Sequence, residues 1–409
     1  MNGNLMKPSS KKTTAKNSPK GSSPQASAGR KNTPKDRLPK RLLEEKKPSF
    51  RSIGPSKTLG LAIWRQLLSL GAALDDAAII ALAHKHKNHC MRLWEGFTGH
   101  KALPRDYLSR SEYRLAYLLS FHLINSARLE VLLRRLMSER RMNLPDLPVN
   151  LWDFGCGSGA MASTVIDYLA SKRLKLAELH LGDSIASLLA QVEKSLLVAL
   201  PKGLLLGKIH RHTSTFAPGD VRTAQLDPEQ THIFTFGYHL NELDEVARAN
   251  MVAWMGKLAR SRAPVLVLIV DSSDEQVCKG LMDFRDEVVE NGMKAIYPCP
   301  HDYACPLVAT NDWCYSESLW NLPAIQQKID EIIQHPRRTM TMSSYAYANQ
   351  SFLRHQRLPA KPQKVLVGKP LDKFRKDMQI PVYCQEDGEI KKELDLAVPR
   401  LQAMRGSVK

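Results

Sequence analysis

A glycine-rich turn at residues 153–160, with the sequence DFGCGSGA, restricts the possible folds of this chain more than any other feature. It follows a short apolar run and precedes a stretch with helical spacing that contains STVIDYLAS. Glycines at alternate positions let the backbone turn sharply and approach a ligand closely, and the amide groups of the next helix point toward a negative part of that ligand. The order of strand, glycine loop and helix therefore predicts the first unit of a parallel sheet and a cradle for a cofactor.

Short apolar runs continue to alternate with helical stretches after this turn, which is typical of a doubly wound α/β fold with a parallel sheet. We expect five strands, near residues 150–154, 178–182, 204–210, 232–236 and 264–270. Beyond Asn291 the regularity ends, and we expect a carboxy-terminal elaboration that does not continue the sheet.

The part of the chain before the sheet divides in two. Residues 1–50 contain 13 basic and 3 acidic residues, which give +10 of the net charge of +18, and no aromatic residue before Phe50. Such a segment buries too little apolar surface to fold, so we predict a disordered basic arm. Residues 51–145 show apolar residues at three- and four-residue spacing and form a predicted amino-terminal helical region.

The remaining predicted domains are a Rossmann-like core at residues 146–297 and a cysteine-rich region at residues 298–409.

The excess of basic over acidic residues favours a polyanionic partner such as RNA or DNA, because basic patches attract phosphate backbones. A charged tail that keeps the protein soluble is the alternative. No apolar run reaches the roughly 20 residues that cross a bilayer, so we expect no membrane partner. The oligomeric state cannot be read from the sequence.

The glycine loop admits three interpretations. With Asp153 before the first glycine it reads DxGxGxG, the pattern of class I methyltransferases that bind S-adenosylmethionine, and Asp183 at the end of the second strand is placed to accept the ribose hydroxyls of an adenosine. Read as GxGxxA, with Ala160 last, the same loop fits a nicotinamide dinucleotide. A tight turn that serves packing alone is the third interpretation, and S-adenosylmethionine is favoured.

Catalytic residues are harder to assign. After the fourth strand the chain reads FGYHLNEL at residues 236–243, without the paired prolines that usually follow this strand in methyltransferases of exocyclic amines. Tyr238 could stack on a base, and His239 or Glu242 could move a proton. We assign no catalytic residue, and whether the protein is an S-adenosylmethionine-dependent methyltransferase remains open at this point.

Three cysteines, Cys299, Cys305 and Cys314, follow a C-x5-C-x8-C spacing in which two prolines stiffen the loop. Thiolates at such spacing can hold one soft metal centre, for which Cys384 would supply the fourth ligand. Zinc and a 4Fe-4S cluster both fit this ligand set, and reduced cysteines without a metal are the alternative.

The segments LWDFGCGSGA, GYHLNEL, PCPHDYACPL, DWC and YCQEDG together resemble the family of small-ribosomal-subunit methyltransferase-like proteins, whose mitochondrial members assist ribosome assembly. The resemblance spans roughly residues 105 to 395. It implies a class I methyltransferase fold, binding of small-subunit rRNA, and two sets of site residues: S-adenosylmethionine on Asp153, Gly155, Gly157, Gly159 and Asp183, and a 4Fe-4S cluster on Cys299, Cys305, Cys314 and Cys384. The chain departs from the family pattern after the fifth strand, where it reads VDSS, and after DWC, where it reads YSES.

The resemblance therefore predicts an assembly or translation factor for the small ribosomal subunit, with a structural 4Fe-4S cluster. An active rRNA methyltransferase is one alternative, and a zinc-stabilised nucleic-acid-binding module with a vestigial cofactor pocket is another. The arm is rich in Lys and Pro and poor in the amphipathic Arg pattern of import signals, so we expect a bacterial cytoplasmic location, with the mitochondrial matrix as the alternative.

Overall fold

The structure, a computed structural model, divides the chain into residues 1–49 and residues 50–409. The described residues are 59–356, without 70–73, 98–102, 104–106, 140–141, 214–217, 311, 321 and 338, and then 364–368, 378–379, 382–385, 389–392 and 398–399. The predicted basic arm lies outside them. No described helix combines the length and the apolar character needed to cross a membrane.

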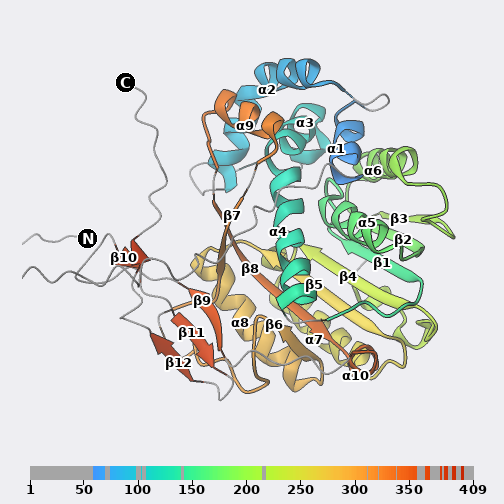
Figure 1. Ribbon diagram of the computed structural model, residues 1–409, viewed down its shortest axis with the longest axis vertical. Helices are drawn as coiled ribbons and strands as arrows, with labels where there is room; N and C mark the ends of the chain where they lie inside the picture. The colour runs from blue at the N-terminus through green and yellow to red at the C-terminus, as the bar shows by residue number, and fades with distance from the viewer. Residues whose placement is uncertain are drawn as a thin grey trace, which may run out of the picture. The chain divides into compact units, whose positions relative to one another are not determined.

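A central mixed sheet organises the described part of the chain (Figure 1). Its strand order is β3-β2-β1-β4-β5-β8-β6, with β7 attached to β8. Strand β8 runs antiparallel to β5 and to β6, and the first five strands are mutually parallel. The strand bounds are β1 Val149–Phe154, β2 Leu176–Asp183, β3 Ile209–Thr213, β4 Thr231–Gly237, β5 Val265–Asp271, β6 Lys294–Tyr297, β7 Ser316–Leu319 and β8 Thr339–Ala348.

Helices cover both faces of this sheet because its strands are apolar on both sides. Along β5, which is buried throughout, Leu266, Leu268 and Val270 join the core that includes α4, α5 and α6, and the alternate residues join a second core with α7 and α8. This is the double winding that the sequence predicts. The helix bounds are α4 Leu123–Arg134, α5 Ala160–Lys172, α6 Ala186–Ala199, α7 Glu245–Ala259, α8 Glu275–Glu290 and α10 Gln350–Arg354.

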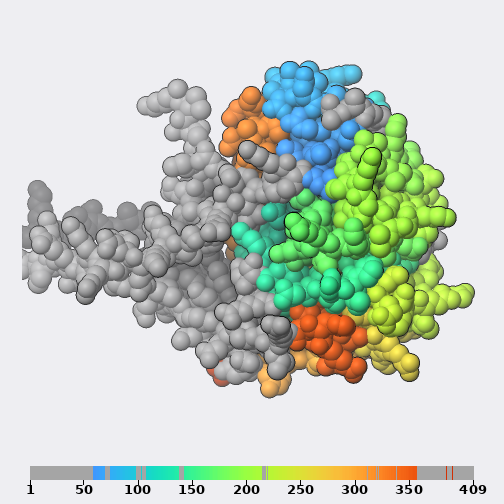
Figure 2. Space-filling model, turned by 45° about the vertical axis from the view of Figure 1, so that its right-hand side comes forward, coloured from blue at the N-terminus to red at the C-terminus, as the bar shows by residue number. Residues whose placement is uncertain are grey.

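The predicted helical region is also present. Its elements are α1 Leu59–Ser69, α2 Asp76–Phe97, the 3-10 turn η2 Tyr107–Ser109, α3 Ser111–Tyr117, the π-helical segment η3 Leu118–His122, which leads into α4, and the π-helical segment η4 Arg135–Glu139. Helix α9, Ala324–Ile332, packs against α2 although more than 200 residues separate them, as the orange and blue segments of Figures 1 and 2 show. The Gln326 side-chain amide donates a 3.1 Å hydrogen bond to the carbonyl of Leu119, which also connects α9 to η3.

Two expectations about strands are wrong. The third strand begins at Ile209, not at Leu204, because Gly203 turns the chain in the left-handed region (φ 73°) and only a single bridge, Leu205 to Leu176, precedes the regular ladder. The sheet also does not end near Asn291, since β6 and β8 follow that residue and complete the sheet. The class I methyltransferase sheet is therefore present. Its strand β8 comes from the region that the sequence predicts as an elaboration.

Small pieces of sheet follow farther along the chain. Strands β9 Lys364–Gly368, β11 Val382–Gln385 and β12 Ile390–Lys392 form a three-stranded antiparallel sheet, and β10 Met378–Gln379 pairs with β13 Val398–Pro399. Strand β9 lies beside β7, which places Cys384 of β11 near the end of the cysteine-rich loop.

Candidate functional site

The glycine loop lies where the strand order reverses, between β1 and β4. Such a reversal opens a crevice at the carboxyl ends of the strands, where α/β proteins bind ligands. Gly155, Gly157 and Gly159 all adopt left-handed backbone conformations, with φ of 62°, 50° and 72°. A Cβ atom at Gly157 would have no neighbour closer than 3.9 Å, so the backbone of this glycine faces open space.

Asp153, in β1, holds the glycine loop in position. It is only 2% exposed, its Oδ2 accepts a 3.0 Å hydrogen bond from the amide of Ala162, and its Oδ1 accepts one of 2.7 Å from the hydroxyl of Thr235. Burial raises the pKa of Asp153 to about 7, although both hydrogen bonds oppose the shift. The side chain therefore ties β1 to α5 and β4, and it positions the loop.

Asp183 lies at the end of β2 and faces the same loop. Its Oδ2 accepts a 2.9 Å hydrogen bond from the amide of Gly157, and its Oδ1 accepts one of 3.0 Å from the amide of Ile185. The carboxylate is only partly buried and keeps further lone pairs for other donors. The structure thus brings together the glycine loop and the acid that the sequence predicts for one site.

The segment after β4 forms the opposite wall of the crevice. A Cβ atom at Gly155 would lie 2.8 Å from Nδ1 of His239, so only glycine fits beside this imidazole. Burial raises the pKa of Glu242, and the nearby charge of Asp183 raises it further. Burial lowers the pKa of His239, against the attraction of Asp183. His239 and Glu242 therefore belong to the crevice, as the sequence suggests.

Tyr238 differs from the predicted base-stacking residue. Its backbone takes the left-handed conformation (φ 58°), its side chain is partly buried, and the guanidinium of Arg128 lies 5.5 Å from its ring centre. Burial raises the pKa of the Tyr238 hydroxyl to about 12. One face of this ring is thus already occupied by a cation from α4.

Residues of the amino-terminal helical region lie over the crevice. No pattern in the sequence predicts this arrangement. Nδ1 of His122 lies 3.0 Å from the hydroxyl of Ser158 in the glycine loop. Burial raises the pKa of Tyr107, and the charges of Glu242 and Asp183 add to the shift, so this phenol lies near both acids. Their positions depend on how the helices pack on the sheet, which no local pattern encodes.

The four predicted metal-binding cysteines also come together, although they are up to 85 positions apart (384 minus 299). Burial raises the pKa of Cys314 well above its usual value, and Cys299, Cys305 and Cys384 each raise it further. Cys314 and Cys384 are buried in one small cluster against which Cys305 packs.

The surroundings of the cysteines hold hydrogen-bond donors and a buried cation. Arg285, 1% exposed, interacts with Cys299 and donates hydrogen bonds to the carbonyls of Tyr303 and His301. Nε2 of His301 lies 3.1 Å from Sγ of Cys384. The positive charge of Arg285 favours the thiolate forms of Cys299 and Cys305, and thiolates are the forms that bind metals.

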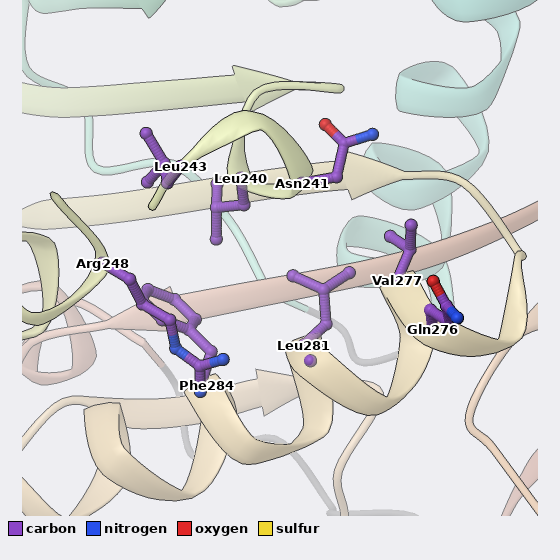
Figure 3. Close-up of a pocket in the computed structure, with 9 residues that line it drawn as sticks. Leu240, Asn241, Leu243, Arg248, Gln276, Val277, Leu281 and Phe284 are labelled. Atoms are coloured by element: carbon purple, nitrogen blue, oxygen red, sulfur yellow. The ribbon is translucent and has the colours of Figure 1, made fainter. Parts of the chain in front are cut away.

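A separate pocket of about 260 Å³ lies between α7, α8 and the 3-10 turn η7, Leu240–Glu242 (Figure 3). Leu240 and Leu243 face Leu281 across it, and the guanidinium of Arg248 lies over the ring of Phe284. None of the glycine-loop residues lines this pocket. It is therefore distinct from the cofactor crevice.

Comparisons with known proteins give one family match. A model of the family described as mitochondrial small ribosomal subunit Rsm22 matches residues 130–395, which are 266 of the 409 residues. No curated protein matches the chain.

Solved structures of methyltransferases resemble the chain distantly. One is an S-adenosylmethionine-dependent methyltransferase from Leishmania major, with 12% identity, a TM-score of 0.26, and coverage of 65% of this chain and 82% of that chain. Another is a geranyl diphosphate C-methyltransferase from Streptomyces coelicolor, with 11% identity, a TM-score of 0.29, and coverage of 64% of this chain and 97% of that chain. The fold assignment rests on the strand order and not on these similarities.

Proposed function

The chain belongs to the mitochondrial small ribosomal subunit Rsm22 family, and we propose that it acts in small-subunit assembly as an S-adenosylmethionine-binding protein with a methyltransferase fold. The observation that carries this proposal is the extent of the family match, which runs from α4 through the whole sheet to the last cysteine. The mitochondrial wording of the family description favours the matrix over the bacterial cytoplasm as the location.

The glycine loop and the acids beside it suit S-adenosylmethionine in backbone conformation and in charge. Gly155, Gly157 and Gly159 would hold it along the open backbone, and Asp183 would accept its ribose hydroxyls. The acids Asp183 and Glu242 favour a cationic ligand, and a sulfonium is one. When bound, this cofactor supplies an electrophilic methyl group. The chain's own residues bind it, hold the loop in place through Asp153, and cover the crevice through the helical region.

Binding of small-subunit rRNA is the proposed role of the basic surface. The charge balance supports it, since the chain carries 59 basic against 41 acidic residues and phosphate is the most abundant anion of a ribosomal subunit. In this proposal the fold serves as a scaffold during assembly. The alternative, an active rRNA methyltransferase, is favoured by the presence of His239 and Glu242 beside the glycine loop.

Replacement of Asp183 separates these two functions. We expect Asp183→Ala to weaken binding of S-adenosylmethionine at least tenfold by titration calorimetry, because the ribose hydroxyls lose their acceptor. Asp183→Asn, which keeps one acceptor oxygen, checks that the loop remains folded, and Glu290→Ala, at the exposed end of α8, is the matched control.

The same variants are then tested for rescue of small-subunit assembly in cells that lack the protein. Rescue by Asp183→Ala despite lost cofactor binding supports the scaffold. Failure of both Asp183 variants, with normal rescue by the control, supports the methyltransferase.

A 4Fe-4S cluster on Cys299, Cys305, Cys314 and Cys384 is the second part of the proposal. Four cysteines, of which Cys299 and Cys305 lie near the buried Arg285, form a suitable ligand set. In a zinc site the sulfurs would lie about 3.8 Å apart, given Zn–S bonds of about 2.3 Å. The same four cysteines could also bind zinc, so metal analysis of the purified protein decides between the two centres.

This cluster would join the cysteine loop to β11 and stabilise both. We expect Cys305→Ser to remove iron and sulfide from anaerobically purified protein and to lower its melting temperature and its binding to small subunits. Cys90→Ser is the control, because Cys90 is a buried thiol in α2, away from the other cysteines.

Loss of iron with unchanged melting temperature would contradict a stabilising role. Zinc in place of iron would favour the zinc-stabilised nucleic-acid-binding module.

A further inference from the structure

Strands β2 and β3 form one edge of the sheet (Figure 1). A group of imidazoles lies at this edge, on the face opposite the core that includes α5 and α6. Glu178 and His180 alternate along β2 with Leu179 and Leu181, which pack into the core with α6, so the two polar side chains point to the other face. Strand pairing places His210 of β3 directly beside His180. Three possible metal ligands therefore meet on one surface, away from both the glycine loop and the cysteines.

The donor atoms of this group are close together. Nε2 of His180 lies 3.4 Å from Oε2 of Glu178, and Nε2 of His210 lies 3.5 Å from Oε1 of the same carboxylate. A tetrahedral zinc ion with bonds of about 2.0–2.2 Å to nitrogen and oxygen needs ligand atoms about 3.4 Å apart. In the described part of the chain this is the one group of three or more such ligands whose atoms all lie within 4.8 Å of one another.

Nε2 of His180 and Nε2 of His210 are both buried, and neither has a hydrogen-bond partner within the described residues. A buried polar atom without a hydrogen-bond partner is unfavourable, so such an atom calls for a ligand. The side chain of His180 is also deeply buried, with the residue 8% exposed.

The second nitrogen of His180 is positioned as metal sites require. Its Nδ1 lies 3.1 Å from Nε2 of His212, so a proton on Nδ1 can be donated to His212 while Nε2 keeps its lone pair. Metal-binding histidines usually donate their other N–H in this way.

A cavity of about 710 Å³ opens beside the group and is lined by Trp152, Glu178, His180 and His212 among others. It exists because the described residues between β3 and β4 form only two 3-10 turns, η5 Pro218–Asp220 and η6 Thr223–Gln225, where a longer crossover helix would cover the sheet. A fourth coordination position would face this space.

One ligand has to move for an ion to bind. The rings of His180 and His210 are stacked, with centres 4.5 Å apart and planes 8° from parallel, so their Nε2 lone pairs do not yet converge. His210 is on the edge strand and its side chain is 37% exposed, which leaves it room to rotate toward the carboxylate.

We propose that Glu178, His180 and His210 form a binding site for Zn²⁺ or a similar divalent transition-metal ion, with His212 as the positioning residue and one coordination position open to the cavity. The ligand set of two imidazoles and one carboxylate suits this class of ion. The site is independent of the cofactor crevice and of the cysteine cluster.

Titration calorimetry with Zn²⁺ tests the site in the full chain after dialysis against a mild chelator. Co²⁺ provides a second probe, because tetrahedral Co²⁺ absorbs in the visible range and thiolate ligands add a separate charge-transfer band. The variants are His210→Gln at the exposed edge, His212→Ala, Cys305→Ser, and His84→Gln as a control at an exposed histidine of α2.

We expect one Zn²⁺ per chain in the wild type, in His84→Gln and in Cys305→Ser, in addition to any metal on the cysteines. His210→Gln should weaken this binding at least tenfold, His212→Ala should weaken it about 10- to 100-fold, and the Co²⁺ spectrum should lack the thiolate band. Unchanged circular dichroism of His210→Gln shows that the fold is intact. Equal Zn²⁺ binding by the wild type and His210→Gln, no binding by the wild type at micromolar Zn²⁺, or loss of this binding in a Cys305→Ser variant with unchanged circular dichroism would each overturn the proposal.

Discussion

Buried titratable side chains around the glycine loop make the stability of this protein sensitive to acid. His122 illustrates this, because it is fully buried against Ser158 and burial lowers its pKa to about 3. In the unfolded chain the same imidazole has a pKa near 6.5. Between these two values the unfolded state binds a proton that the folded state does not, so stability falls as the pH falls.

We predict that His122 alone lowers the unfolding free energy by about 2 kcal/mol when the pH falls from 7 to 5, because it takes up a proton only in the unfolded chain. The measurement is urea unfolding of the wild type and of His122→Gln, which cannot titrate, at both pH values. The wild type should lose about 2 kcal/mol more than the variant over this range. Equal losses would mean that His122 is protonated or exposed in the folded protein.

The sequence motif predicts the positions of Asp153 and Asp183 but not their different roles. The motif correctly places Asp153 and Asp183 beside the glycine loop, because strand, loop and helix determine where both strands end. It does not distinguish an acid that holds the loop from an acid that faces the crevice. That difference depends on Thr235 of the neighbouring strand, which accounts for one of the two hydrogen bonds of Asp153.

Among the elements, β8 and the turn after it hold the sheet together where the sequence predicts no strand. Asn349 follows β8 and is fully buried. Its Nδ2 donates to the carbonyls of Leu258, Ser261 and Ala263 at 3.2, 3.2 and 2.9 Å, and its Oδ1 accepts from the amides of Val265 and Phe352 at 3.1 and 2.9 Å. One amide therefore connects α7, β5 and α10.

We predict that Asn349→Ala lowers the unfolding free energy by about 3 kcal/mol or more, because buried backbone groups lose their partner. Asn349→Asp should also destabilise, since a carboxylate cannot donate to the three carbonyls. The control is Asn291→Ala, an exposed asparagine with one hydrogen bond, which should cost well under 1 kcal/mol. Chemical unfolding checks all three, and a small effect of both Asn349 variants would contradict this role.

Pattern alone placed four of the five parallel strands, β1, β2, β4 and β5, because apolar runs of this length, separated by helices, favour only one arrangement. It failed for β8, where TMTMSSYAYA alternates small, polar and aromatic residues and lacks the Val- and Ile-rich run of a buried strand. It also misplaced β3, where the apolar LLL at residues 204–206 is a turn and the histidine-rich IHRHT is the strand. In both cases the deciding contacts come from the neighbouring strands.

At the scale of the whole molecule, a buried ion pair joins the segment after the cysteines to the amino-terminal helices. Arg337 donates a 3.0 Å hydrogen bond to the carboxylate of Asp330 and another hydrogen bond to the carbonyl of Ser120. Its guanidinium also lies 5.7 Å from the ring centre of Trp94 and 5.6 Å from that of Trp320. Sequence offers no signal for the contact between Arg337 and Ser120, because these two residues are more than 200 positions apart.

We predict that Arg337→Ala destabilises the protein by about 3–5 kcal/mol, since it leaves the buried carboxylate of Asp330 without its partner. The double variant with Asp330→Ala should recover part of this loss. Lys279→Ala is the control, because Lys279 pairs with Glu275 on the surface and should cost less than about 1 kcal/mol. Thermal unfolding measures the series, and additive effects of the two single substitutions would argue against the pair.

The position of β8 between β5 and β6 has a consequence for the protein while it is being synthesised. Strand β5 ends at Asp271, and the last residue of its partner β8 is Ala348, 77 residues later (348 minus 271). At about 5–20 residues per second, a ribosome needs roughly 4–15 s to make that stretch. During this interval the nascent chain exposes the unpaired edge of a strand that is apolar up to Val270, of the kind on which other chains aggregate.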